Sequence, residues 1–203
     1  MPGILPRALA AIGLALIGAV SSASAQETVR IRGIIEQVEG PVYVVKNRDG
    51  AELKLTVTDN PLFVAIAPAT MADIKPGMFV GSTAMPGPDG SLRAVEVHIF
   101  PEAMRGTGEG HRPFNIPGST MTNGTAAGAT VTGVDGSAIK VKYKEGEKVI
   151  VVPPNVPIVR YEIGSLADLK SGAAFTVLAA TKKPDGSFEA PRINVGRDGV
   201  VPQ

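Results

Sequence analysis

Two histidines, a methionine and a glutamate lie close together in the middle of the chain and have the chemistry to bind a metal ion. They are His98, Met104, Glu109 and His111, which fall within fourteen residues. Imidazole nitrogen binds copper, zinc and nickel, and thioether sulfur favours Cu(I). The spacing matches no standard pattern, because the chain has no H-x-H, no histidine pair at helical spacing and no M-x-x-M cluster here. A copper or zinc site is therefore one of two interpretations of this segment.

The other interpretation is an ordinary strand followed by a loop. In "AVEVHIF" the alternation places Val95, Val97 and Ile99 inward and leaves Glu96 and His98 on the outer face. A histidine on a solvated strand face, and another that bonds to the backbone in the "GHRP" loop, need no metal. Under this interpretation the chain requires no cofactor.

Enzymatic chemistry lacks its usual motifs. Ser119 follows Gly118 near His111, but there is no G-x-S-x-G elbow and no evident third group to orient a base. The glycines of "RGTGEGHRP" match neither the P-loop nor the dinucleotide fingerprint. We assign no catalytic residue and expect a protein that is not an enzyme.

Three residues of the same region are of types that commonly anchor interfaces: Arg112, Phe114 and Met121. They lie in a Gly- and Pro-rich stretch that is long for a structureless loop inside a compact protein. Its apolar residues also distinguish it from a purely flexible tether. We expect a structured connector that forms a binding surface for a small ligand or an envelope protein.

An internal duplication is the clearest sign of how the chain is organised. "TMADIKPG" (70–77) matches "SLADLKSG" (165–172) at an offset of 95 residues, and "PDGSL" (88–92) matches "PDGSF" (184–188) at an offset of 96. We expect two copies of one unit. The expected boundaries are a signal peptide 1–25, a first repeat 26–100, a connector 101–128 and a second repeat 129–203.

Each copy carries the signals of short β-strands. In "AIKVKYKEGEKVIVV", Ile139 and Val141 alternate with lysines, and a Glu-Gly pair marks a turn. In "VYVVKNRDGAELKLTV", Leu55 lies on the inward face and an Asp-Gly pair marks the turn. Both patterns predict β-hairpins.

One short helical segment interrupts the strands of each copy. Thr70 and Ser165 are typical N-cap residues, and Asp73 and Asp168 follow three residues later. Five short strands with one helix before the last hairpin predict an all-β fold of two tandem, small OB-like β-barrels. A plain sandwich is the alternative.

The N-terminal residues have the pattern of an export signal. Arg7 is their only charge, an apolar run spans 8–20, and Ala23 and Ala25 fit the A-x-A cleavage rule. The run is shorter than the roughly 20 residues that a spanning helix needs. We expect cleavage before Gln26 and a periplasmic mature chain, with secretion as the alternative and no integral membrane segment.

Charge and composition exclude some partners. Without Arg7 the chain has 19 basic and 19 acidic residues, and it has no Trp. A neutral chain with few aromatics is not typical of a nucleic-acid-binding protein. The chain also lacks cysteine, which excludes disulfide and thiolate chemistry.

Several segments resemble a known family. The runs "AVEVHIFPEAMRGTGEGHRP", "STMTN" and "VGRDGV" look like an uncharacterised exported family of proteobacteria. The repeated "LADLK-G … PDG" unit is similar to a bacterial domain of unknown function with OB-like barrel character. Such proteins often carry the automatic label "metal ABC transporter permease", which this chain does not support because a permease needs several membrane spans. The resemblance implies an exported protein with two OB-like repeats and assigns no catalytic residue.

Overall fold

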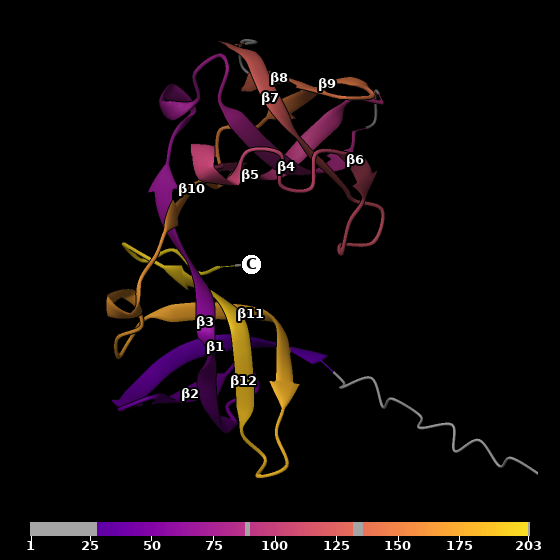
Figure 1. The fold of residues 1–203 in the computed structure, drawn as a ribbon. Helices are drawn as coiled ribbons and strands as arrows, with labels where there is room; N and C mark the ends of the chain where they lie inside the picture. Colours follow the sequence, from indigo (N-terminus) through magenta and orange to yellow (C-terminus); the bar gives the residue numbers. More distant parts are fainter. Residues whose placement is uncertain (1–27, 88–89, 132–135, 203) are drawn as a thin grey trace, which may run out of the picture.

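The computed structural model describes residues 28–87, 90–131 and 136–202. It confirms an all-β protein, in which the strands join into one hydrogen-bonded sheet (Figure 1). The strands are β1 (Thr28–Glu39), β2 (Val42–Asn47), β3 (Glu52–Ala69), β4 (Phe79–Pro86), β5 (Leu92–Ile99), β6 (Gly110–Pro113), β7 (Thr120–Val131), β8 (Ser137–Tyr143), β9 (Gly146–Val152), β10 (Ile158–Ile163), β11 (Ala174–Lys182) and β12 (Phe188–Gly196). Short 3-10 segments are η1 (Met71–Asp73), η2 (Glu102–Met104) and η4 (Leu166–Asp168).

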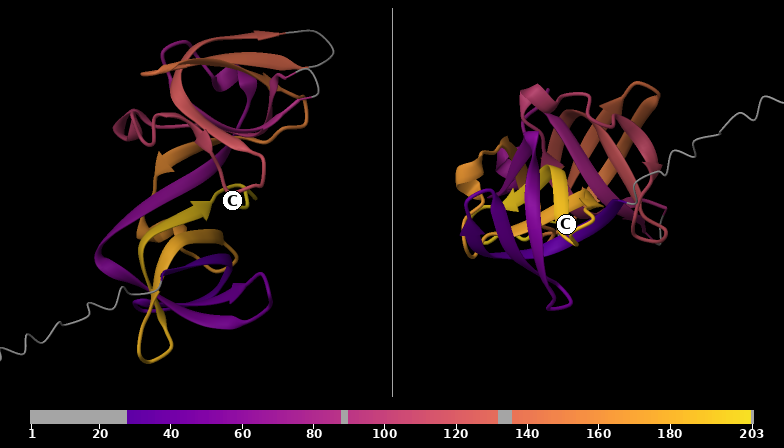
Figure 2. Two further views of the ribbon diagram at one scale, coloured as in Figure 1. Left: turned by 90° about the vertical axis from the view of Figure 1, so that its right-hand side faces the viewer. Right: turned by 60° about the horizontal axis from the view of Figure 1, so that its bottom comes forward.

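The sheet closes on itself twice and forms two five-stranded barrels. The terminal barrel has the order β1-β2-β3-β12-β11 and closes where β11 pairs with β1. The central barrel has the order β7-β8-β9-β5-β4 and closes where β4 pairs with β7. The paired strands β3 and β10 connect the two barrels, and β10 also pairs with β5 (Figures 1 and 2).

Each barrel takes strands from both halves of the duplication. The first half supplies β1–β3 to the terminal barrel but β4 and β5 to the central one, and the second half does the converse with β7–β9 and with β11 and β12. The boundaries 26–100 and 129–203 therefore describe the sequence repeat and not the two barrels. The 18-residue strand β3 explains this exchange. At about 3.3 Å per residue it is roughly 60 Å long, so it carries the chain out of one small barrel and into the other.

The first strand of the second half also begins earlier than expected. β7 starts at Thr120, inside the stretch predicted to be the connector 101–128. Most of the remaining connector is ordered against the central barrel, because η2 follows β5 and β6 pairs with β7. The prediction of a structured connector holds for this part of the chain.

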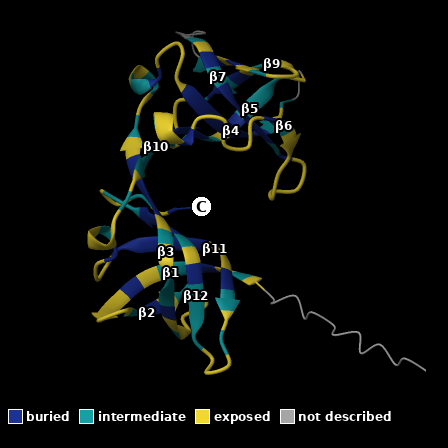
Figure 3. Cartoon of the chain, viewed as in Figure 1, coloured by how far each residue is buried: buried dark blue, intermediate teal, exposed yellow. Residues whose placement is uncertain are grey.

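Apolar residues fill both barrels, and the predicted inward positions of three of them are confirmed. Leu55 lies in the core of the terminal barrel, and Ile139 and Val141 lie in the core of the central barrel. A third apolar cluster joins the barrels and includes Phe79 and Phe100. Figure 3 shows buried residues along the strands of both barrels, alternating with exposed ones, and exposed residues in many of the connecting loops.

The predicted caps are also confirmed, although the helical segments are single 3-10 turns. The carboxylate of Asp73 accepts hydrogen bonds from the backbone N–H and hydroxyl of Thr70, both at 2.8 Å. Asp168 accepts the backbone N–H of Ser165 at 2.8 Å. Asp168 also binds the guanidinium of Arg197, with an Nε–Oδ1 distance of 2.8 Å.

A glycine in the first strand of each barrel lies against a neighbouring carbonyl group. A Cβ added to Gly33 would lie 1.9 Å from the Lys46 carbonyl oxygen, and one added to Gly124 would lie 2.2 Å from that of Lys142. In both strands a bulge follows two residues later. These glycines therefore occupy equivalent positions, and no residue with a Cβ fits at either one unless the backbone moves.

The predicted signal peptide, 1–25, lies outside the described residues. Within the described part of the chain, no helix has the length and apolar character needed to span a membrane.

Candidate functional site

A cleft of about 550 Å³ lies between the two barrels. Strands β1, β11 and β12 of the terminal barrel form one wall, and β4, β5 and the segment before β7 form the other; the C-terminal residues also lie between the barrels (Figures 1 and 2). Its volume falls within the roughly 300–1,000 Å³ of small-molecule sites. The lining residues are Arg30, Arg32, Thr83, Val95, Glu96, His98, Phe114, Asn115, Ile116, Met121, Pro157, Tyr161, Leu178, Arg192 and Asn194.

Three arginines make the terminal-barrel wall cationic. Arg30 and Arg32 alternate on β1 with the core residue Ile31, and so both side chains point out of the barrel. Arg192 lies beside the core residue Ile193 on β12 and points out for the same reason. All three guanidiniums therefore reach one cleft from strands that are far apart in sequence.

These arginines have no acidic partner among the described residues, because no carboxylate oxygen lies within 4.0 Å of their guanidinium nitrogens. The Nε of Arg32 is buried and has no hydrogen-bond partner within the part of the chain that the structure describes. Burial, followed by the charges of Arg30 and Arg48, lowers the pKa of Arg32. Burial also lowers the pKa of Arg192. Arg30 is exposed and Arg32 and Arg192 are partly buried, so this wall presents positive charge to the cleft.

The central-barrel wall carries a group of apolar side chains. Phe114, Ile116 and Val95 are each more than one-third exposed, and Leu178 faces them from the terminal barrel with similar exposure. Val95 does not point inward as predicted. It is the extra residue of a bulge, since Thr83 pairs with Glu96 whereas the next residue of β4 pairs with Ala94. The bulge turns this side chain into the cleft.

His98 is buried and not on a solvated face, which corrects the sequence prediction. It points away from the central-barrel core, but Tyr161 of β10 stacks on it with ring centroids 5.1 Å apart. Phe100 contacts its ring edge-on at 5.0 Å. Burial lowers the pKa of His98 to about 4, so the imidazole is neutral at pH 7.

A buried polar group beside His98 completes the floor of the cleft. The Nδ1 of His98 lies 3.8 Å from Oε1 of Glu96 and has no hydrogen-bond partner among the described residues. Burial raises the pKa of Glu96 and that of Tyr161. Perturbed, unsatisfied groups that face a cleft are typical of functional sites.

The residues singled out from the sequence separate into three places. His98, Phe114 and Met121 line the cleft. Glu109, His111 and Arg112 line a shallow hollow beside β8 and β9. Met104 is buried in the apolar cluster between the barrels.

The two histidines lie on opposite faces of the central barrel wall. His98 Nε2 and Asn123 Oδ1 crowd the same face of Gly81. His111 Nδ1 hydrogen-bonds the hydroxyl of Thr122 at 2.8 Å. Thr122 and Asn123 are successive strand residues and point to opposite faces. The structure therefore does not assemble the predicted metal ligands, and the described residues contain no group of three or more His, Asp or Glu side chains placed to bind an ion.

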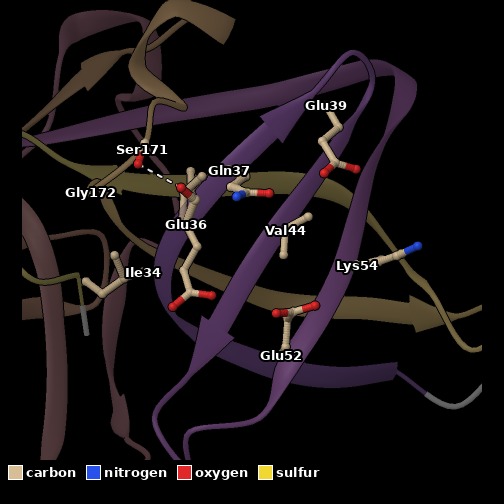
Figure 4. A pocket seen from close by; sticks show the side chains of 10 residues that line it. Ile34, Glu36, Gln37, Glu39, Val44, Glu52, Lys54, Ser171 and Gly172 are labelled. Atoms are coloured by element: carbon tan, nitrogen blue, oxygen red, sulfur yellow. Dashed lines mark hydrogen bonds between the residues drawn. The ribbon is translucent and has the colours of Figure 1, made fainter.

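A second, open hollow of about 630 Å³ lies on the outer face of the terminal barrel (Figure 4). Three carboxylates line it, those of Glu36, Glu39 and Glu52, together with Lys54. Ser171 donates a hydrogen bond to the Glu36 carbonyl at 2.7 Å. This hollow lacks the enclosed apolar wall of the cleft.

The arginines and Tyr161 were missed in the sequence. A signal was present, because "VRIRG" and "RINVG" each place arginine in alternation with core aliphatics. Its meaning depends on β1 and β12 facing the same cleft, which the local pattern does not reveal.

No protein-family model, no curated protein and no solved structure matches this chain.

Proposed function

We propose that the protein is an exported, non-enzymatic binding protein that holds a small organic ligand in the cleft between its barrels. The observation that carries the proposal is a cleft in which buried polar groups without partners face exposed apolar side chains. His98 Nδ1 and Arg32 Nε are both buried and unbonded within the described residues. A bound ligand would satisfy such groups and cover the apolar wall.

The cleft favours binding over catalysis. Nucleophilic catalysis requires a nucleophile within reach of a base. The described lining offers the hydroxyls of Thr83 and Tyr161 but no serine or cysteine. Thr83 is a buried strand residue, and burial raises the pKa of Tyr161. The export signal in the sequence supports a periplasmic location, where a soluble binding protein would meet its ligand.

A neutral fluorescent probe, N-phenylnaphthylamine, tests the cleft without regard to ligand charge. We expect saturable binding at one site per chain. Leu178→Ser should weaken it about tenfold, which corresponds to about 1.4 kcal/mol. Leu62→Ser is the matched control, because Leu62 is equally exposed on a strand but does not line the cleft. Absence of saturable binding, or equal effects of the two variants, would overturn the proposal.

A further inference from the structure

We infer that the ligand of the cleft is an amphipathic anion, with one acidic headgroup bound by arginines and one apolar chain laid against the opposite wall. This inference rests on the proposed function and specifies the class of ligand. It follows from how charge and apolar surface are distributed across the cleft.

The charge of the lining is one-sided. Arg30, Arg32 and Arg192 face a single carboxylate, that of Glu96, so the lining carries a formal charge of +2 when His98 is neutral. Without Arg7 the whole chain has no net charge. The excess is therefore local, and a local cluster of unpaired cations in a low-dielectric cleft attracts anions.

The geometry of the cationic wall suits an oxyanion. Arg32 on β1 is in register with Thr176 of β11, which is in register with Asn194 of β12. Arg192 donates from Nε to Asn194 Oδ1 at 3.0 Å, which orients its guanidinium on this wall. Guanidinium groups bind carboxylate or phosphate oxygens in a planar, often bidentate manner. Arg32 is partly exposed in the cleft lining, and no carboxylate of the described residues pairs with it.

The opposite wall suits an apolar chain. Phe114, Ile116 and Val95 of the central barrel face Leu178 across the cleft, and each of these four side chains is more than one-third exposed. Covering this surface would add hydrophobic stabilisation of about 25 cal/mol per Å². Glu96 is the one carboxylate among the described lining residues, and the three arginines outnumber it.

The contrasting hollow supports this assignment. The open hollow in Figure 4 presents three carboxylates and one lysine, and an anion would be repelled there. Anions should therefore bind in the cleft and not in this hollow.

Three compounds with the same alkyl chain test the headgroup: octanoate, octanol and octyltrimethylammonium. We expect calorimetry to show that octanoate binds at least tenfold more tightly than octanol, and that the ammonium compound binds most weakly. In Arg32→Met the preference for octanoate over octanol should disappear. Arg93→Met, which changes an arginine of β5 outside the cleft lining, is the matched control and should keep the preference.

The outcomes separate this inference from the proposed function. Equal affinity for octanoate and octanol, tighter binding of the ammonium compound, or an unchanged preference in Arg32→Met would overturn the inference. If N-phenylnaphthylamine still binds in a manner sensitive to Leu178→Ser, the binding function survives that result. If neither octanoate nor the neutral probe binds, both proposals fail.

Discussion

The terminal and central barrels share one backbone architecture but present different side chains to the cleft that separates them. Both use the same cyclic order of strands, a capped 3-10 turn and a glycine packed on a carbonyl in the first strand. The terminal barrel turns arginines to the cleft, whereas the central barrel turns apolar side chains and His98 to it. The duplication accounts for the shared fold of the two barrels, and the candidate site lies where their outer faces carry different side chains.

The largest expected effect is a loss of stability on replacing the equivalent glycine of each barrel. Gly33→Ala and Gly124→Ala should each destabilise the protein by about 3 kcal/mol, because the new methyl group meets a backbone carbonyl that cannot move alone. Chemical denaturation of both variants measures this loss. A large effect at one glycine and none at the other would show that the two positions are not equivalent.

A pH-dependent effect on stability is expected from His98 of the central barrel. The folded pKa of His98, about 4, lies below the ordinary 6.5, so the unfolded chain binds the proton more readily. Stability from this group is therefore complete above pH 6.5 and is lost as pH falls towards 4, by about 3 kcal/mol. Glu96, whose pKa burial raises, acts in the opposite direction.

The variant His98→Gln isolates the contribution of His98, because Glu96 and the neighbouring Arg112 are present in both proteins. The stability of wild type relative to His98→Gln should decrease between pH 7 and pH 4. Thermal unfolding across that range measures it, and parallel pH profiles would contradict the burial of a neutral imidazole.

The variant Arg32→Met should show that the cationic wall contributes to ligand binding and not to stability. Replacing Arg32 by methionine removes a buried, unbonded Nε, so Arg32→Met should unfold at the same temperature as wild type or higher while octanoate binding falls about tenfold. Differential scanning calorimetry with and without octanoate measures both properties. A destabilised variant with unchanged binding would assign this arginine to the fold.

The two capped turns differ by one ion pair. Asp168 binds Arg197 in addition to its cap, whereas Asp73 binds only Thr70 in the described structure. Asp168→Asn should cost on the order of 1 kcal/mol, and Asp73→Asn should cost less. Both losses should vanish at low pH, because the hydrogen bonds hold both carboxyl pKa values below the usual range. Equal losses at pH 7 would mean that the Arg197 pair adds nothing.

The smallest effect concerns the metal prediction. Because His98 and His111 lie on opposite faces of the barrel wall, the double variant His98→Ala/His111→Ala should bind copper and zinc as wild type does. Calorimetric titration checks this. Submicromolar binding that is lost in the double variant would restore the metal-handling role predicted from the sequence.

Local features of the fold were predictable, and non-local ones were not. The hairpins, the caps at Thr70 and Ser165 and the inward position of Leu55 follow from period-2 alternation and turn chemistry, which act over a few residues. Strand exchange between the halves depends on long-range pairing. The sequence separation of Gly33 and Gly124 is also smaller than the 95 or 96 residues that separate the other repeated segments. Their equivalence was therefore not evident from the sequence.

The same limit applies to the site. Phe114 and Met121 were recognised by residue type, but Arg32 and Arg192 meet only because β1 and β12 belong to one barrel. The burial of His98 depends on Tyr161, which arrives on β10 more than sixty residues later. No pattern around His98 alone contains that information.

A crystal structure of the protein grown with octanoate would show directly whether the cleft binds an amphipathic anion. We expect one octanoate between the barrels, with its carboxylate within hydrogen-bond distance of Arg32 and its chain against Ile116 and Leu178. An octanoate bound elsewhere, or one in the cleft with its carboxylate turned away from the arginines, would contradict it.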